Sequence, residues 1–190
     1  MHAAESMPEV AARGPAVSPG IERVLTLLAH QPPRADILEP FVEAARDVIA
    51  AELGTEVAPG KLAVARGAAT TRDVTVLIGI TGRLTGIVTY GMSDEMALTI
   101  VGKLMGAPVA ELDEMVLSGV AELGNVIAGR ATTLLVGMGL HTMITPPILL
   151  VGGGSRLTVA NIPRLMVPLN TDLGTVESQL AVKVTGAKTV

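Results

Sequence analysis

Two polar side chains that could take part in a chemical reaction lie about one turn apart on a helix that we predict from about Glu111 to Val136. Glu122 supplies a carboxylate and Asn125 a carboxamide. Ser118 and Gly129 extend the same row, at spacings of i, i+4, i+7 and i+11. With about 3.6 residues per turn, these positions share one side of the helix. They form a flat ridge, and the missing side chain of Gly129 leaves room for another surface to approach closely.

The other side of this helix carries an apolar stripe, which predicts a buried face. Its members are Val116, Val120, Leu123, Ile127, Ala131 and Leu134. Glycine and asparagine are weak helix formers, yet four such residues lie inside the helix: Gly119, Gly124, Asn125 and Gly129. We expect that a requirement other than helix stability selected them. Spacing alone leaves a simpler interpretation open, in which Glu122 and Asn125 belong to an ordinary solvated face.

The elements that must position this helix can be predicted from turn and capping residues. A helix from Asp36 tolerates Pro40 in its first turn and stops at Gly54, with Ile37, Phe41, Ala44, Val48 and Ala51 on one face. Ser93 is the expected N-cap of a second helix, which ends at Gly106. The expected strands are Lys61–Arg66, Val74–Ile80, Leu84–Tyr90, Ile148–Val151, Leu157–Asn161, Arg164–Pro168 and Gln179–Val184. Successive strands predict hairpins, and therefore an α+β fold in which long helices pack on a largely antiparallel sheet.

Other groups that could carry chemistry are weaker candidates. The three histidines, His2, His30 and His141, are far apart and have no neighbours at ligand spacing, so we expect no metal site. The segment Gly152–Ser155 lacks the lysine and following helix of a phosphate loop, and a hairpin turn is the better interpretation. Thr70 and Thr71 have no nearby base and are interpreted as turn residues.

The segment from Leu117 to Gly129 resembles the signature of the CheC/CheX/FliY phosphatases. That signature has Asp or Ser, Glu four residues later, Asn three residues after that, and a proline some twenty-odd residues further on. Ser118, Glu122, Asn125 and Pro147 stand at these positions. The resemblance runs from about Asp36 to Val184 and implies a CheC-like fold. The segment Asp47–Ala50 of the first helix weakly repeats Asn125–Ala128. In this repeat, Ala44 and Asp47 stand where Glu122 and Asn125 stand in the long helix. The chain therefore resembles the CheX-type members of the family, which have one site.

The resemblance implies a protein phosphatase that removes phosphate from the aspartyl group of a phosphorylated CheY-type response regulator. It makes Glu122 and Asn125 catalytic and places Ser118 and Gly129 in the binding surface. Asn125 would orient the attacking water, and Glu122 would pair with the partner's active-site lysine. Mg²⁺ is expected in the response regulator, and this chain is expected to need no cofactor of its own. The resemblance also implies a homodimer joined through its sheets, and the C-terminal strands are apolar enough to pair.

Two other function classes remain open beside the enzyme. The domain could hold a response regulator, or dimerise, without turnover. It could also be structural, as related domains are in flagellar switch proteins, although no separate switch-type domain follows Val184. An intact Glu122 and Asn125 pair favours the enzyme.

Composition sets the outer limits of these interpretations. The 190 residues carry a net charge of -4 with no basic tract, which disfavours nucleic-acid binding. The chain has no cysteine, which excludes disulfides and thiolate chemistry and permits a cytoplasmic location. The most apolar stretch is interrupted by His141, Pro146 and Pro147, so we expect a soluble protein without a membrane span. Residues 1–35 are expected to be a flexible tail, and residues 36–186 the phosphatase domain.

Overall fold

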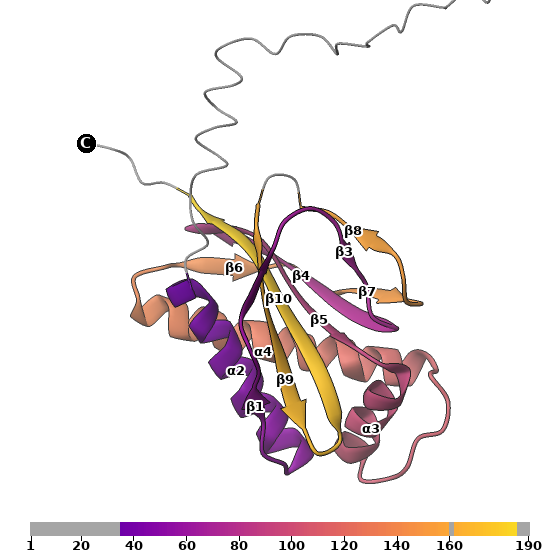
Figure 1. Cartoon of the computed structure of the whole chain (residues 1–190). Helices are drawn as coiled ribbons and strands as arrows, with labels where there is room; N and C mark the ends of the chain where they lie inside the picture. Colours follow the sequence, from indigo (N-terminus) through magenta and orange to yellow (C-terminus); the bar gives the residue numbers. More distant parts are fainter. Residues whose placement is uncertain (1–34, 160–161, 186–190) are drawn as a thin grey trace, which may run out of the picture. The chain divides into compact units, whose positions relative to one another are not determined.

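A computed structural model describes residues 35–159 and 162–185 of the chain. Nearly all of the predicted tail, residues 1–34, lies outside these residues. The described helices are α2 (Ala35–Leu53), α3 (Asp94–Met105) and α4 (Glu114–Gly137) (Figure 1). The strands are β1 (Ala58–Pro59), β2 (Ala63–Ala65), β3 (Ala69–Thr70), β4 (Val74–Gly82), β5 (Leu84–Met92), β6 (Thr142–Ile144), β7 (Ile148–Val151), β8 (Arg156–Leu157), β9 (Arg164–Thr171) and β10 (Gly174–Val184).

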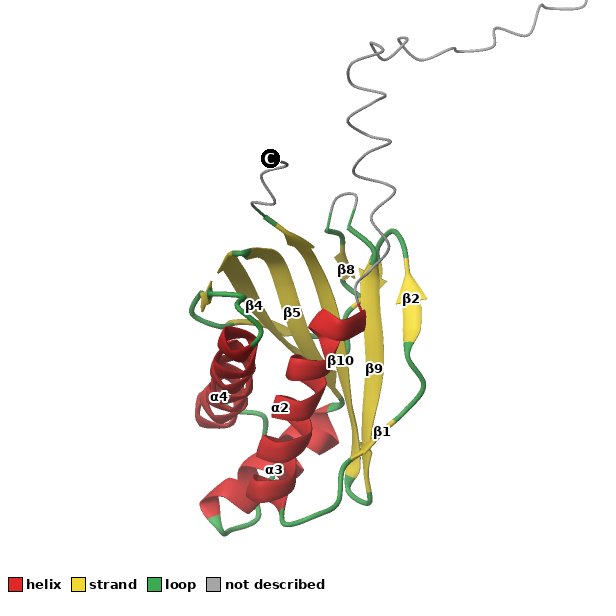
Figure 2. Ribbon diagram, turned by 90° about the vertical axis from the view of Figure 1, so that its left-hand side faces the viewer, coloured by secondary structure: helices red, strands yellow, loops and turns green. Residues whose placement is uncertain are grey.

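Within the described part of the chain, one sheet has the strand order β1-β9-β10-β5-β4-β6. β2 also pairs with β9, and β7 also pairs with β4. Every described strand pair is antiparallel. α2, α3 and α4 lie on the same side of the sheet (Figure 2). The predicted α+β fold with a largely antiparallel sheet is therefore confirmed.

The core between the helices and the sheet is mainly aliphatic, as the composition requires. The two aromatic residues, Phe41 and Tyr90, are both fully buried in it. On β4, the residues Val74, Val76, Ile78 and Ile80 alternate toward the helices and are almost inaccessible to solvent. Such alternation is typical of a sheet with one covered face, and it fixes the register of β4 against its neighbours.

Capping residues set the ends of the first two helices close to the predicted positions. α2 ends at Leu53, and Gly54 follows with a positive φ of 65°. Ser93 accepts a hydrogen bond from the Met96 backbone N–H at the start of α3, and Gly106 ends α3 with a φ of 67°. The predicted face of α2 is buried except at Ala51, which is exposed.

Three predictions about the chain path need correction. The long helix begins at Glu114 rather than Glu111, because the side chain of Asp113 caps it by accepting from the Val116 N–H at 2.9 Å. Gly152–Ser155 is a turn, but it joins β7 to β8, which pair with different strands, β4 and β3. The backbone N–H groups of Gly152 and Gly154 donate to the carbonyls of Asp73 and Thr71, and this holds the turn away from a simple hairpin.

The third correction concerns the C-terminal strands, which the sequence suggested for dimer pairing. β10 lies in the middle of the sheet and pairs with both β5 and β9. The sheet edges are instead formed by β1 and β2 on one side and by β6 and β7 on the other.

Among the described helices, none is long and apolar enough to cross a membrane.

Candidate active site

The candidate site lies on α4, and two of its glycines fix how this helix sits in the fold. A β-carbon at Gly124 would lie 2.7 Å from Val76 Cγ1 of β4. A β-carbon at Gly119 would lie 3.0 Å from Val101 Cγ2 of α3. Both glycines therefore allow close packing of α4, on the sheet and on α3 respectively. This explains two of the four weak helix formers by packing, and leaves Asn125 and Gly129 for another explanation.

The buried side of α4 follows the predicted apolar stripe with two changes. Gly124, Ala128 and Leu135 join the buried face, and Leu134 is only half-buried. The remaining members of the stripe are buried as expected. This wide contact orients α4 firmly, because rotating the helix would expose several apolar side chains at once.

The predicted site residues lie on the outer side of α4. Ser118 and Glu122 are exposed, and Asn125 and Gly129 are half-buried. Within the described residues, neither the Glu122 carboxylate nor the Asn125 carboxamide has a hydrogen-bond or ion-pair partner. A β-carbon at Gly129 would meet no atom within 4 Å. The outer side thus presents two unengaged polar groups, with free space beside them.

The same outer side is unusually poor in charge. From Met115 to Gly137, only Glu122 and Arg130 are charged. Three apolar side chains on this side are 45–50% exposed, namely Met115, Val126 and Val136. A helix face that meets only water generally carries many charged residues. These exposed apolar residues were not predicted from the sequence, although the lack of charge along the helix was a signal for them.

The side chain of Arg130 connects α4 to α2 through an ion pair. Its guanidinium donates to the Asp47 carboxylate at 2.6 Å. This hydrogen bond lowers the pKa of Asp47 below its ordinary value, although partial burial acts in the opposite direction. Asp47 is the α2 residue that weakly repeats Asn125, and Ala44, which repeats Glu122, is fully buried. α2 therefore presents no exposed pair equivalent to that of α4.

The signature proline lies where the edge strand beside α4 is interrupted. Pro146 and Pro147 separate β6 from β7, both of which pair with β4. At the interruption, the Gly79 N–H donates to Thr145 Oγ1 at 2.9 Å, and the Thr145 N–H donates to the Gly79 carbonyl. A β-carbon at Gly79 would lie 2.8 Å from Thr145 Cγ2, so glycine is needed here. The interruption is thus closed by local hydrogen bonds rather than left as an open break.

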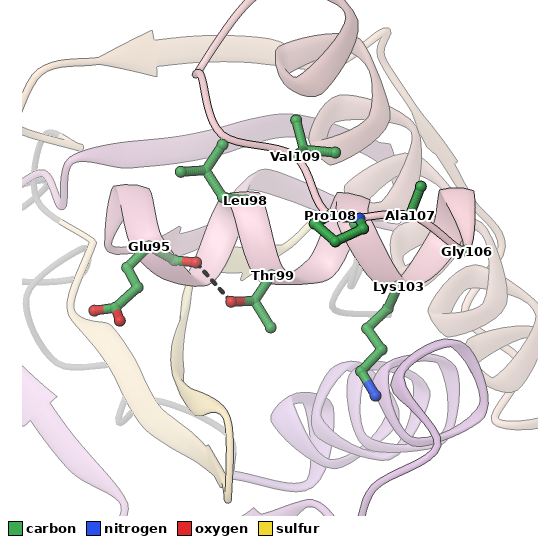
Figure 3. A pocket seen from close by; sticks show the side chains of 9 residues that line it. Glu95, Leu98, Thr99, Lys103, Gly106, Ala107, Pro108 and Val109 are labelled. Carbon is green, nitrogen blue, oxygen red and sulfur yellow. Dashed lines mark hydrogen bonds between the residues drawn. The ribbon is translucent and has the colours of Figure 1, made fainter.

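Other candidate features do not join this site. A groove lies along α3 and the segment after it, with Leu98, Pro108 and Val109 on one side and Glu95 and Lys103 at its ends (Figure 3). It includes none of the predicted site residues. Among the described residues, no group of three or more His, Asp or Glu side chains is arranged to hold a metal ion.

Comparisons with known sequences match this chain to one protein family. The model of the family described as "Chemotaxis phosphatase CheX" matches residues 74–170, a segment that contains all four predicted site residues and Pro147. The protein called "CheY-P phosphatase CheX" from Thermotoga maritima is 34% identical over 119 residues, which cover 62% of this chain and 77% of that protein.

Solved structures with a similar fold bear related names. The CheX of a CheX-CheY-BeF3-Mg complex from Borrelia burgdorferi matches with a TM-score of 0.66 and 30% identity, over 79% of this chain and 99% of that one. The chemotaxis protein CheX from Desulfovibrio desulfuricans matches with a TM-score of 0.71 and 25% identity, over 78% of this chain and 99% of that one. The matched regions span nearly the whole of both relatives.

Proposed function

The chain belongs to the CheX family of chemotaxis phosphatases, and we propose that it uses Glu122 and Asn125 to hydrolyse the aspartyl phosphate of a CheY-type response regulator. The observation that carries this assignment is the state of the two side chains. Both lie on the outer side of α4 and have no partner within the described residues. Polar groups held ready on a rigid helix are suited to act on another molecule.

The reaction requires few chemical groups from the phosphatase itself. The response regulator's own domain supplies Mg²⁺ and a lysine, which neutralise charge on the phosphoryl group. What remains is to place a water molecule in line with the leaving carboxylate, because phosphoryl transfer depends mainly on positioning and electrostatics. In our proposal, the Asn125 carboxamide orients this water. Water attacks phosphorus, the bond to the aspartyl oxygen breaks, and inorganic phosphate and a free aspartate result.

Glu122 and Gly129 have binding roles in this proposal. The Glu122 carboxylate pairs with the lysine of the regulator and fixes the register of docking, about one turn from Asn125. The open space at Gly129 allows the regulator's surface to approach the helix closely. Ser118 is exposed at the start of the row and is placed in the binding surface.

The proposal extends to assembly and location. We expect a homodimer that forms through sheet edges, where exposed apolar side chains are available: Leu62 and Val64 next to β9, and Met143 and Ile148 next to β4. We also expect the protein to work in the cytoplasm, where it would meet its regulator.

The competing candidate is a domain that binds a response regulator without turnover. A time course of phosphate release from phosphorylated CheY-type regulators, with and without this protein, separates the two. The phosphatase predicts that release accelerates in proportion to the protein concentration. If the protein binds a phosphorylated regulator and its phosphate loss keeps the same rate, the binding function replaces the phosphatase.

A further inference from the structure

Two exposed apolar side chains bracket the polar pair along α4. Met115 is 50% exposed and lies two turns before Glu122. Val126 is 45% exposed and lies one turn after Glu122, next to Asn125 in the chain. At about 1.5 Å per residue, Met115 and Val126 are about 16 Å apart along the axis. A surface that touched both would lie across the polar pair between them.

The rest of this face is suited to contact with a protein surface. Between the two apolar residues, Glu122 is the one charged side chain, and the other outward residues, Ser118 and Asn125, are short and uncharged. Low charge and exposed apolar groups distinguish the centre of a protein interface from ordinary surface. Val136 is also exposed, but it lies at the far end of the helix, about 15 Å beyond Val126.

We propose that Met115 and Val126 are specificity-determining contacts that pack on an apolar patch of the response regulator beside its phosphorylation site. This inference rests on the proposed function, since it assigns the partner surface of the same site. Continuity with Glu122 and Asn125 identifies the occupant, because any surface docked on that pair must also cover its neighbours. Both contacts form before the chemical step and persist through it.

This arrangement divides the work between two kinds of residue. Contacts that are equally strong in the bound substrate and in the transition state lower KM and leave kcat unchanged. Met115 and Val126 act in this way. Asn125 contributes when the water attacks, so its effect appears in kcat. The split between KM and kcat therefore distinguishes docking residues from residues that act on the reaction.

The test variant is Met115→Gln combined with Val126→Gln. Glutamine is uncharged and a good helix former, so net charge and helix propensity are preserved while apolar surface is lost. The matched control is Leu104→Gln, which changes a side chain that is 40% exposed and lies on α3, a helix that carries none of the proposed contact residues. The probe is a CheY-type regulator activated with beryllofluoride, which binds but cannot turn over.

We expect Kd for this probe and KM for the phosphorylated regulator to rise about tenfold in the double variant, with kcat within about twofold of wild type. Leu104→Gln should change neither constant. Unchanged Kd in a folded double variant overturns the inference, and so does a fall in kcat at constant KM. If the double variant does not fold, Val126→Ala decides instead, because alanine strengthens the helix and still removes the contact.

Failure of the proposed function gives a different pattern. If wild type binds the activated regulator without hastening phosphate loss, the catalytic assignment fails, and the Kd comparison still decides the role of Met115 and Val126. If wild type binds no activated regulator from its own organism, both proposals are overturned.

Discussion

Gly124 of α4 lies so close to Val76 of β4 that a β-carbon at residue 124 would stand 2.7 Å from Val76 Cγ1. The next residue in the chain is Asn125. Because neighbouring residues on a helix point about 100° apart, the contact that presses Gly124 onto the sheet directs Asn125 toward the outer side. The packing of one glycine therefore positions the side chain to which we assign the chemistry.

Gly124→Ala should destabilise the domain by about 1–3 kcal/mol, because Val76 is a buried, branched side chain that cannot move aside easily. Denaturant unfolding of wild type and variant measures the difference. Gly129→Ala is the matched control on the same helix. Its added methyl group meets open space, and alanine is the better helix former, so stability should rise by up to about 1 kcal/mol. Equal effects at the two positions would contradict the packing described for α4.

The ion pair between Asp47 and Arg130 should make a small, pH-dependent contribution to stability. Because the hydrogen bond from Arg130 lowers the pKa of Asp47 in the folded state, the contribution is full above the ordinary value of 3.8 and is lost as the pH falls through the lowered pKa. Both side chains are partly exposed, which limits the effect to about 1 kcal/mol or less.

Asp47→Asn tests this expectation. Its unfolding free energy should be lower than that of wild type at pH 7, and the difference should shrink in acid below pH 3.8. Glu52→Gln, a change on the exposed side of the same helix, should leave stability nearly unchanged at both pH values. A difference for Asp47→Asn that persists undiminished in acid would assign the effect to something other than the charge.

The sequence predicted the fold where the signal was local. Ser93 and Gly106 define α3 through capping chemistry, and alternation along β4 predicts a strand covered on one face. The Gly152–Ser155 turn could not be placed in the same way, because its partners Thr71 and Asp73 are about 80 residues away in the chain. The short strands β1, β3 and β6 were missed for a related reason: two or three residues carry no period.

The candidate site was predicted in part. Helical spacing put Glu122 and Asn125 on one face, opposite the apolar stripe, and the structure places them there. The pattern could not separate glycines chosen for packing from one facing open space, because that difference depends on Val76 and Val101 in other elements. The link from Arg130 to Asp47 likewise joins two helices whose relative placement is set by the whole core.

We expect the protein to form a homodimer at micromolar concentration. The reason is physical: both edges of the sheet carry exposed apolar side chains, and unpaired edge strands are prone to associate. Light scattering coupled to size-exclusion chromatography measures the mass. A mass of about 19.4 kDa at that concentration, that of one chain, would contradict the expectation.

Glu122→Ala should weaken docking as well as turnover. The carboxylate is assigned to a lysine of the regulator, so its loss removes a contact that exists before the reaction begins. Titration with a beryllofluoride-activated regulator should show a higher Kd, together with a lower rate of phosphate release. Unchanged affinity would show that Glu122 does not contact the regulator in the way we propose.

Ile127→Ala provides the comparison for effects that arise from folding alone. Ile127 is buried on the core side of α4, and its truncation should cost about 2–5 kcal/mol of stability. Any loss of activity in this variant should follow its loss of folded protein. Asn125 is only half-buried on the other side of the helix, so its truncation leaves no comparable cavity.

The rate of phosphate release with Asn125→Ala in place of wild type tests the assignment of Asn125 most directly. Regulator binding and thermal stability should stay close to wild type, because alanine is the better helix former and the carboxamide has no partner within the described residues. The acceleration of dephosphorylation should fall by about 100-fold or more, as expected when a positioned polar group is removed from a transition state. Full activity of Asn125→Ala, on a regulator that wild type dephosphorylates, would contradict the assignment.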